Sequence, residues 1–174
     1  VGVRDPQGFR PLCLGKTAHG YVLSSESCAF DAIKAEFIRD IDPGEMVIID
    51  DRGVRSTIYA EPQKIDKKLC VFEYIYFARS DSKIDGQSVY ETRLNMGREL
   101  YNETKYDADI VMSIPDSGTT AALGYARASG IPFAEGLIKN RYSGRTFIKP
   151  NQEERELAVR MKLNAMPEVV GGKR

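Results

Sequence analysis

The residues with the clearest chemical potential form a run of small polar side chains at the end of an apolar stretch. Asp116, Ser117, Gly118 and Thr119 follow the apolar residues 110–114 and lead into an alanine-rich segment. Where a strand passes directly into a helix, the first helical N–H groups are unpaired and favour a phosphate or diphosphate. The hydroxyls of Ser117 and Thr119 suit phosphate oxygens or a hydrated Mg²⁺, and Gly118 allows a ligand to approach the backbone closely. A capped turn that binds nothing is the alternative.

A second candidate is the stretch 139–149, which is rich in cations and contains no acid. Arginine grips phosphate with two hydrogen bonds, and the Ser143-Gly144 pair offers a hinge. A mobile lid over a polyphosphate substrate has this composition, whereas the alternative is an ordinary solvated loop. The residues assigned to the lid are Lys139, Arg141, Tyr142 and Arg145. Neither stretch has the spacing of a Walker loop or of G-x-G-x-x-G.

The remaining reactive side chains are interpreted as structural. His19 is the only histidine and lies in a predicted turn, so a solvated histidine is expected instead of a catalytic one. Asp50 and its neighbour Asp51 are interpreted as turn formers. Cys13 and Cys28 are interpreted as small buried apolar residues. No C-x-x-C pair exists, which argues against a zinc site or a disulfide framework and favours a reducing, cytoplasmic compartment.

The first sixty residues predict the antiparallel elements of an α+β fold. Strands are expected at 1–4, 12–14, 20–24, 46–49 and 55–59, the last two joined as a hairpin, with an amphipathic helix over 28–38. A polar, lysine-rich stretch at 62–68 predicts a boundary between domains. The apolar residues of 70–77, including Tyr74, Tyr76 and Phe77, predict a buried strand or packed segment.

The second half predicts an α/β layer with parallel strands. Helices are expected over 87–105, 119–129 and 151–163, with strands at 108–114 and 132–138 between them. Gly130 suits the end of the second helix, and Asn151 with Glu154 predicts a capping box at the start of the third. These strands would place the 116–119 run and the start of the basic stretch at carboxyl strand ends.

The balance of charge excludes broad electrostatic attraction. The chain has 25 basic and 25 acidic residues, so neither nucleic acid nor a membrane surface is an expected partner. Its 174 residues do not include an apolar run of the roughly 20 residues that cross a bilayer.

Several motifs together resemble the glutamine phosphoribosylpyrophosphate (PRPP) amidotransferase family. In chain order they are Gly2-Val3-Arg4-Asp5-Pro6-Gln7-Gly8-Phe9-Arg10-Pro11-Leu12, Ser25-Glu26-Ser27, Pro43-Gly44-Glu45, Phe72-Glu73-Tyr74-Ile75-Tyr76-Phe77-Ala78-Arg79, Ile114-Pro115-Asp116-Ser117, and Lys139-Asn140-Arg141-Tyr142 with Gly144-Arg145-Thr146-Phe147-Ile148. The last run is the most specific. The resemblance covers nearly the whole chain and departs from the family pattern at Ser80, where proline is usual.

The resemblance implies two partial domains. Residues 1–61 would end an N-terminal-nucleophile glutaminase domain, and residues 62–174 would form the first half of a type I phosphoribosyltransferase domain. The family moves ammonia from glutamine to PRPP, giving phosphoribosylamine and diphosphate in purine synthesis. Asp116 to Thr119 would cradle the diphosphate, with Ser117 near Mg²⁺, and 139–149 would close over PRPP. Cys70 matches one ligand of a [4Fe–4S] cluster in one branch.

The resemblance also implies what the chain lacks. The family's catalytic cysteine and glutamine-binding groups precede Val1, and its ribose-phosphate motif follows Arg174, so no catalytic residue and no activity are expected for this chain alone. The implied parent is a homo-oligomer, by resemblance a tetramer. The alternative function is a PRPP-binding regulator or salvage enzyme with a phosphoribosyltransferase fold.

Overall fold

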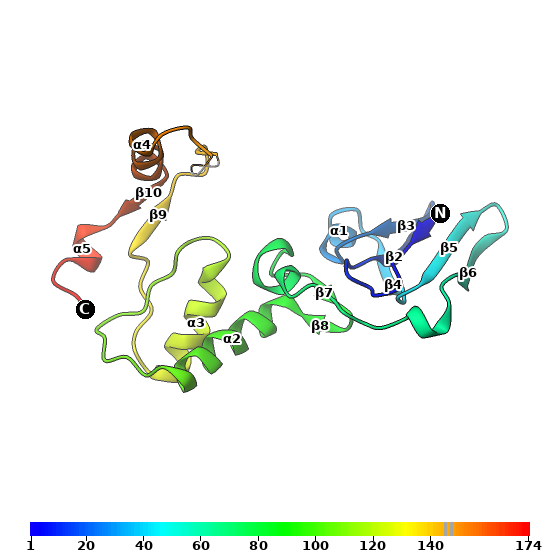
Figure 1. Ribbon diagram of the computed structural model, residues 1–174, viewed down its shortest axis with the longest axis horizontal. Helices are drawn as coiled ribbons and strands as arrows, with labels where there is room; N and C mark the ends of the chain where they lie inside the picture. Colours follow the sequence, from blue (N-terminus) through cyan, green and yellow to red (C-terminus); the bar gives the residue numbers. More distant parts are fainter. Residues whose placement is uncertain (145, 147) are drawn as a thin grey trace. The chain divides into compact units, whose positions relative to one another are not determined.

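The computed structural model describes every residue of the chain except Arg145 and Phe147. The chain divides into two compact units, Val1–Thr92 and Arg93–Arg174. The elements are labelled in Figure 1, where chain colour runs from blue at the N-terminus to red at the C-terminus. The packing division after Thr92 differs in position from the domain boundary at residue 62, which stays a prediction.

The first unit holds two three-stranded antiparallel sheets. One has the order β1-β5-β6 and the other β3-β2-β4. The strands are β1 (Gly2–Val3), β2 (Cys13–Thr17), β3 (Gly20–Ser24), β4 (Glu36–Asp40), β5 (Glu45–Asp50) and β6 (Gly53–Ile58). The predicted hairpin is confirmed, with Asp50 paired to Gly53 across its tip and the Asp50 carboxylate accepting from the N–H of Arg52. The predicted α+β class with antiparallel strands is therefore confirmed for this unit.

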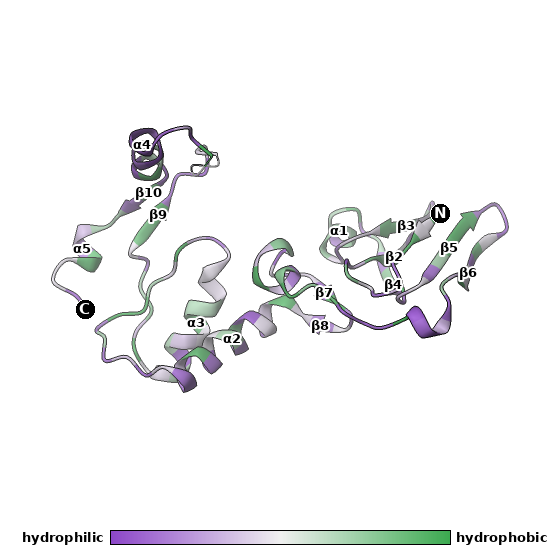
Figure 2. Ribbon diagram, viewed as in Figure 1, coloured by the Kyte–Doolittle hydropathy of each residue, from purple (hydrophilic) through white to green (hydrophobic). Residues whose placement is uncertain are grey.

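A small apolar core lies in this unit. Leu14 of β2, Val47 of β5 and Ile41 between the sheets form its buried centre. In Figure 2 most of β5 is coloured hydrophobic, which agrees with its near-continuous apolar run. Val47 and the partly buried Ile49 lie two residues apart on β5 and therefore share one face of the strand. The partly buried side chains around the centre are Leu12, Leu23, Ile49 and Val54.

The helix predicted over 28–38 is too long. The structure ends α1 (Cys28–Ala32) after five residues, and the chain then turns at Lys34, which has a φ of 54°. Residues 36–40 become β4 instead and pair with β2. Pairing overrides the helical periodicity of the sequence. β2 pairs with β3 on one side, and its backbone N–H and C=O groups on the other side pair with β4.

Arg4 is the most fully bonded buried side chain of this unit. Its Nη1 and Nη2 donate to the two Asp85 carboxylate oxygens at 2.8 and 3.0 Å. The same guanidinium donates to the carbonyl oxygens of Ile41 at 2.6 Å, Arg10 at 3.0 Å and Gly8 at 3.1 Å. The Arg4 side chain is 1% exposed and that of Asp85 8%. Asp85 lies in the turn of a short hairpin, β7 (Lys83–Ile84) and β8 (Gln87–Ser88), that the sequence did not predict.

The lysine-rich stretch is bonded along its length to the loop that follows β1. After the 3₁₀ turn η1 (Pro62–Lys64), the N–H groups of Asp66, Lys68 and Cys70 donate to the carbonyls of residues 6, 7 and 9 at 3.2, 2.7 and 3.1 Å. Arg10 continues this contact, because its guanidinium donates to Glu73 at 2.5 Å. Although its composition is polar, this stretch is therefore held by regular backbone hydrogen bonds.

Residues 70–77, predicted as a buried strand or a packed segment, form no strand. The structure forms the π-helix η2 (Glu73–Phe77), in which Tyr76 and Phe77 are exposed. Tyr74 alone of the three predicted core aromatics packs inward, against the cluster of Ala78, Ile84 and Val89, and its hydroxyl donates to the carbonyl of Ile84 at 3.0 Å. The Tyr76 and Phe77 side chains are 65% and 49% exposed, so the apolar composition of this run did not predict burial.

Two helices pack backbone to backbone in the second unit. They are α2 (Val89–Glu103) and α3 (Gly118–Ser129), close to the ranges predicted from periodicity. A Cβ placed on Gly97 would lie 1.8 Å from the Ala121 carbonyl oxygen, and one on Gly124 would lie 2.1 Å from that of Leu94. Only glycine at both positions permits this approach. Gly130 ends α3 with a φ of 74°, as predicted.

The predicted parallel strands of the second unit are reduced to a single bridge. Within the described residues, 108–114 forms no strand beyond a parallel bridge between Val111 and Phe133. Residues 132–138 yield only β9 (Leu137–Lys139), which pairs antiparallel with β10 (Leu163–Ala165). Parallel strands occur almost only in sheets whose two faces are covered, whereas these two segments form a single bridge. The unit ends with α4 (Gln152–Lys162) and α5 (Pro167–Val170).

Candidate anion site

The loop before α3 presents an uncapped helix N-terminus. Ser117 is the N-cap residue, and its side chain makes no capping hydrogen bond. A Cβ on Gly118 would meet no atom within 4 Å, so the space beside the first helical turn is open. The hydroxyls of Ser113 and Thr119 lie 3.1 Å apart and hold the two sides of the loop together. The N–H of Thr119 donates to the carbonyl oxygen of Asp116 at 3.2 Å, so the anion-site and turn interpretations of this loop both stay predictions.

The parallel bridge explains why the loop meets the start of the basic stretch. Asp116 follows Val111 by five residues, and Lys139 follows Phe133 by six. Because the two bridged segments run parallel, the chain leaves both of them in the same direction, which brings Asp116 and Lys139 close together. Lys139 Nζ lies 2.5 Å from Asp116 Oδ2. The sequence prediction that these two runs share one site is consistent with this contact.

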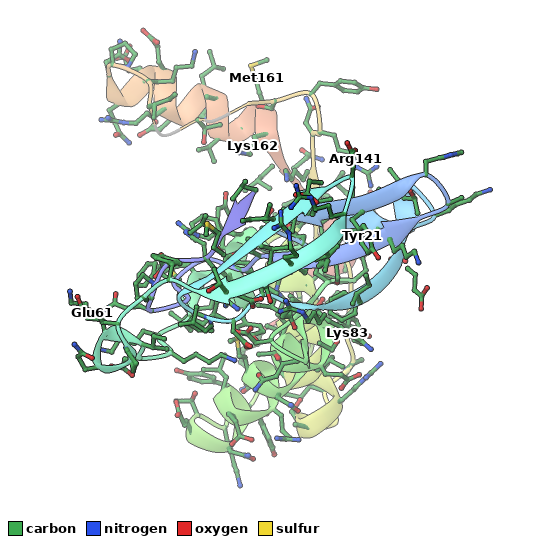
Figure 3. All side chains as sticks on the ribbon, turned by 90° about the vertical axis from the view of Figure 1, so that its right-hand side faces the viewer. Tyr21, Glu61, Lys83, Arg141, Met161 and Lys162 are labelled. Carbon is green, nitrogen blue, oxygen red and sulfur yellow. The ribbon has the colours of Figure 1, made fainter. Side chains whose placement is uncertain are left out.

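The beginning of the basic stretch is anchored by Asn140. Its N–H donates to the Lys162 carbonyl at 2.7 Å, and its side-chain oxygen accepts from the N–H of Tyr142 at 3.0 Å. Figure 3 labels Arg141 in this stretch, and Met161 and Lys162 at the end of α4. Arg141 and Tyr142 are both exposed, Tyr142 completely. The fourth predicted lid residue, Arg145, lies outside the described residues.

The far end of the stretch is fixed by a capped helix. The side chain of Asn151 accepts from the N–H of Glu154 at 2.8 Å, which confirms Asn151 as the N-cap of the predicted capping box. Glu154 Oε1 accepts from the Asn151 side-chain amide at 2.9 Å, in place of the backbone N–H that a full capping box uses. Most of α4 is hydrophilic, as Figure 2 shows. Glu156 and Arg160 approach to 3.9 Å along it, as their spacing predicts. The basic stretch therefore runs between β9 and a firmly started helix.

The arrangement can bind an oxyanion by three means. The first N–H groups and the dipole of α3 attract negative charge. The Ser117 and Thr119 hydroxyls can donate to anion oxygens. The Lys139 ammonium supplies a full positive charge at the same edge. The roles of these residues toward a phosphate ligand stay predictions.

The other reactive residues lie in the first unit. Cys13 and Cys28 are buried, as predicted, and burial raises the pKa of the Cys13 thiol to about 12. His19 is exposed, which agrees with a solvated turn histidine. Cys70 is half-buried. Among the described residues, no group of three or more His, Cys, Asp or Glu side chains is placed to hold a metal ion.

Two residues of the site escaped the sequence interpretation. Ser113 was counted as part of an apolar strand, although its hydroxyl bridges to Thr119. Asn140 was counted only as a member of the basic run, although it joins the run to α4. An asparagine directly before Arg-Tyr-Ser-Gly is a turn signal that could have indicated this role.

Known proteins resemble the chain over its whole length. An amidophosphoribosyltransferase of Archaeoglobus fulgidus is 54% identical over 174 residues, which are 100% of this chain and 38% of that protein. One of Bacillus subtilis is 51% identical over 98% of this chain and 35% of that protein. The resemblance to this amidotransferase family is confirmed. The chain spans little more than a third of these amidophosphoribosyltransferases, and no protein-family model matches it.

Solved structures agree with the sequence relatives. A glutamine PRPP amidotransferase from B. subtilis complexed with ADP and GMP has a TM-score of 0.87 and 51% identity, covering 98% of this chain and 37% of that one. A structure described as the allosteric regulatory enzyme of purine biosynthesis has the same TM-score and identity, with 36% of its chain covered. No helix among the described residues is both long and apolar enough to span a membrane.

Proposed function

We propose that this chain is part of an enzyme that transfers glutamine-derived ammonia to PRPP. Hydrolysis of the glutamine amide gives glutamate and ammonia, and the ammonia displaces diphosphate from PRPP to give 5-phosphoribosylamine. This reaction would be the first step of purine biosynthesis. The observation that carries the proposal is the 54% identity over all 174 residues to a protein named amidophosphoribosyltransferase.

Within that enzyme, residues 1–61 would complete the glutaminase domain and residues 62–174 would begin the phosphoribosyltransferase domain. The antiparallel sheets of the first unit support the first assignment. The Val111–Phe133 parallel bridge, followed by a loop that enters α3, supports the second. Ligands of α/β folds bind where such loops leave the carboxyl ends of parallel segments.

In this proposal the loop from Asp116 to Thr119 holds the diphosphate of PRPP at the N-terminus of α3 through its backbone N–H groups and hydroxyls, not through the Asp116 carboxylate. Lys139, Arg141, Tyr142 and Arg145 would contact or cover the substrate from the basic stretch. Stabilisation of the departing diphosphate would come from these cations and from the helix N–H groups. We expect the 174-residue chain to bind but not to turn over PRPP, since no catalytic residue is assigned within it.

The implied metals fit this chain to different degrees. Mg²⁺ prefers substrate phosphate oxygens with few protein ligands, and the Ser117 hydroxyl beside open space suits one such position. Bound Mg²⁺ would neutralise charge on the diphosphate. A [4Fe–4S] cluster needs four thiolates, whereas the chain has three cysteines, two of them buried. Cys70 is therefore proposed as at most one ligand, and Cys70→Ser should lower the iron content of a cluster-bearing full-length protein.

The relatives do not favour the alternative of a regulator or salvage enzyme, because the matched region includes residues 1–61, which such proteins have no reason to share. We further propose a cytoplasmic enzyme that forms a homo-oligomer. Its tetrameric state rests on the family resemblance alone, as does the use of glutamine and PRPP as its small-molecule partners.

The proposal is tested by diphosphate release from PRPP by the full-length protein, with glutamine and then ammonia as nitrogen donor. We expect release with both donors. Ser117→Ala should weaken release with either donor while glutamine hydrolysis is largely retained. Tight PRPP binding without release from either donor would reject the enzyme in favour of a regulator.

A further inference from the structure

The ligand-free site already contains a negative charge that is close to its main cation. Asp116 Oδ2 accepts from Lys139 Nζ at 2.5 Å. The Asp116 side chain is 72% exposed, whereas that of Lys139 is 28% exposed. Asp116 also directly precedes the N-cap of α3, and its carbonyl oxygen accepts from the N–H of Thr119 at 3.2 Å. One carboxylate thus lies beside two groups that attract an anion.

We propose that Asp116 is an internal competitor for Lys139 that sets the affinity of this site for diphosphate. The inference rests on the proposed function, because it concerns the same anion site. In the free chain, the carboxylate neutralises the ammonium that an incoming diphosphate needs. Binding then requires that Asp116 leave Lys139, or that two anions share one cation at close range.

Charge and geometry favour exchange of partners. An ammonium has three donors, but anions that share it lie only a few ångströms apart and repel each other strongly. The Asp116 side chain is 72% exposed, so water can solvate the carboxylate once it leaves Lys139. Lys139 is more enclosed, because it is the last residue of β9 and pairs with Leu163 of β10. The carboxylate is therefore expected to move while the ammonium stays and receives the phosphate.

The competition predicts that removal of the acid strengthens binding. Inorganic pyrophosphate is titrated calorimetrically into the 174-residue chain and into Asp116→Asn, Lys139→Gln and the double variant. Exposed or half-exposed pairs are weak, so we expect Asp116→Asn to tighten binding about two- to tenfold at low salt. The gain should shrink as salt rises, since screening weakens both the ion pair and the repulsion. Lys139→Gln alone should weaken binding.

The double variant separates competition from general repulsion. If Asp116 acts through Lys139, its removal should gain clearly less in the Lys139→Gln background than in the wild type. Asp107→Asn is the matched control, since Asp107 is also an exposed carboxylate of this unit and pairs with Arg174 at 2.9 Å. This control should leave pyrophosphate binding unchanged.

The outcomes distinguish this inference from the function on which it rests. Wild-type binding that Asp116→Asn weakens or leaves unchanged would overturn the competitor role while the anion site stands. An equal gain in both backgrounds, or an equal gain from Asp107→Asn, would overturn it as well. Absence of binding by the wild type and by Asp116→Asn would reject the site and the competitor together. Binding that appears only in Asp116→Asn would support the competitor.

Discussion

Replacement of Arg4 should destabilise the first unit more than any surface substitution. Arg4→Met preserves length and apolar stem but removes a guanidinium that makes five hydrogen bonds, two of them to Asp85. Asp85 would remain buried with one fewer cation. Burial opposes its ionisation, but the Arg4 hydrogen bonds and charge hold the pKa of Asp85 below its ordinary value.

The expected loss of stability follows from the Asp85 charge that stays buried when Arg4 is removed. Breaking a buried ion pair from one side costs about 3–5 kcal/mol, because the remaining charge is neither solvated nor paired. The lower end is expected here, since Lys67 Nζ lies 3.3 Å from Asp85 Oδ2 and still partly compensates. Three backbone carbonyls also lose their donor. Arg4→Lys keeps the positive charge but loses the planar guanidinium that binds Asp85 with two hydrogen bonds. It should lower the free energy of unfolding by less than Arg4→Met.

Urea unfolding of the 174-residue chain, followed by circular dichroism, measures the effect. With a slope of about 1–3 kcal/mol per M, a loss of about 3 kcal/mol lowers the midpoint by about 1 M or more. Arg55→Met is the matched control, because Arg55 pairs with Asp50 at the exposed tip of the β5–β6 hairpin and should cost no more than about 1 kcal/mol. Equal midpoints for the Arg4 and Arg55 variants would refute the argument that burial makes the Arg4 pair strong.

Three further predictions concern helix packing, pH and capping. Gly97→Ala should destabilise the second unit by about 1–3 kcal/mol in urea unfolding because its Cβ would enter α3, whereas Gly118→Ala has open space and should cost well under that. Hydrogen bonding from Arg39 lowers the pKa of Glu45 from 4.5 to about 2. The stability that ionised Glu45 contributes is therefore complete above about pH 4.5 and is lost as the pH falls toward 2. Glu45→Gln should flatten the dependence of unfolding on pH over that range. Asn151→Ala should cost about 1 kcal/mol and increase amide exchange in the first turn of α4; unchanged exchange would contradict the cap.

Local signals predicted those elements whose reasons are local. Gly130 at the end of α3 and Asn151 at the start of α4 act on backbone groups within four residues, so sequence alone located them. The β5–β6 hairpin was predictable for the same reason, since its turn residues adjoin the paired strands. The loop before α3 was also predictable as a strand-to-helix junction, although the strand proved to be one bridge.

Contacts between distant residues decided the elements that the sequence missed. Residues 36–38 belong to the helix predicted over 28–38, but pairing with the free edge of β2 makes residues 36–40 a strand. The rings of Tyr76 and Phe77 are apolar enough for a core, yet they are exposed and pack edge to face against each other, with centroids 5.7 Å apart. The pairing of Asp116 with Lys139, 23 residues apart, depends on the register of a parallel bridge that no local pattern specifies.

The backbone pairing of residues 66–70 with the loop after β1 has a consequence for proteolysis. A protease binds its substrate as an extended strand and needs several consecutive backbone groups to be free. Lys64, Lys67 and Lys68 look like ideal trypsin sites by composition and exposure. Because every second N–H from Asp66 to Cys70 is already hydrogen-bonded, trypsin should cut this stretch slowly compared with other exposed lysines. The most linker-like composition in the chain would then mark one of its protease-resistant segments.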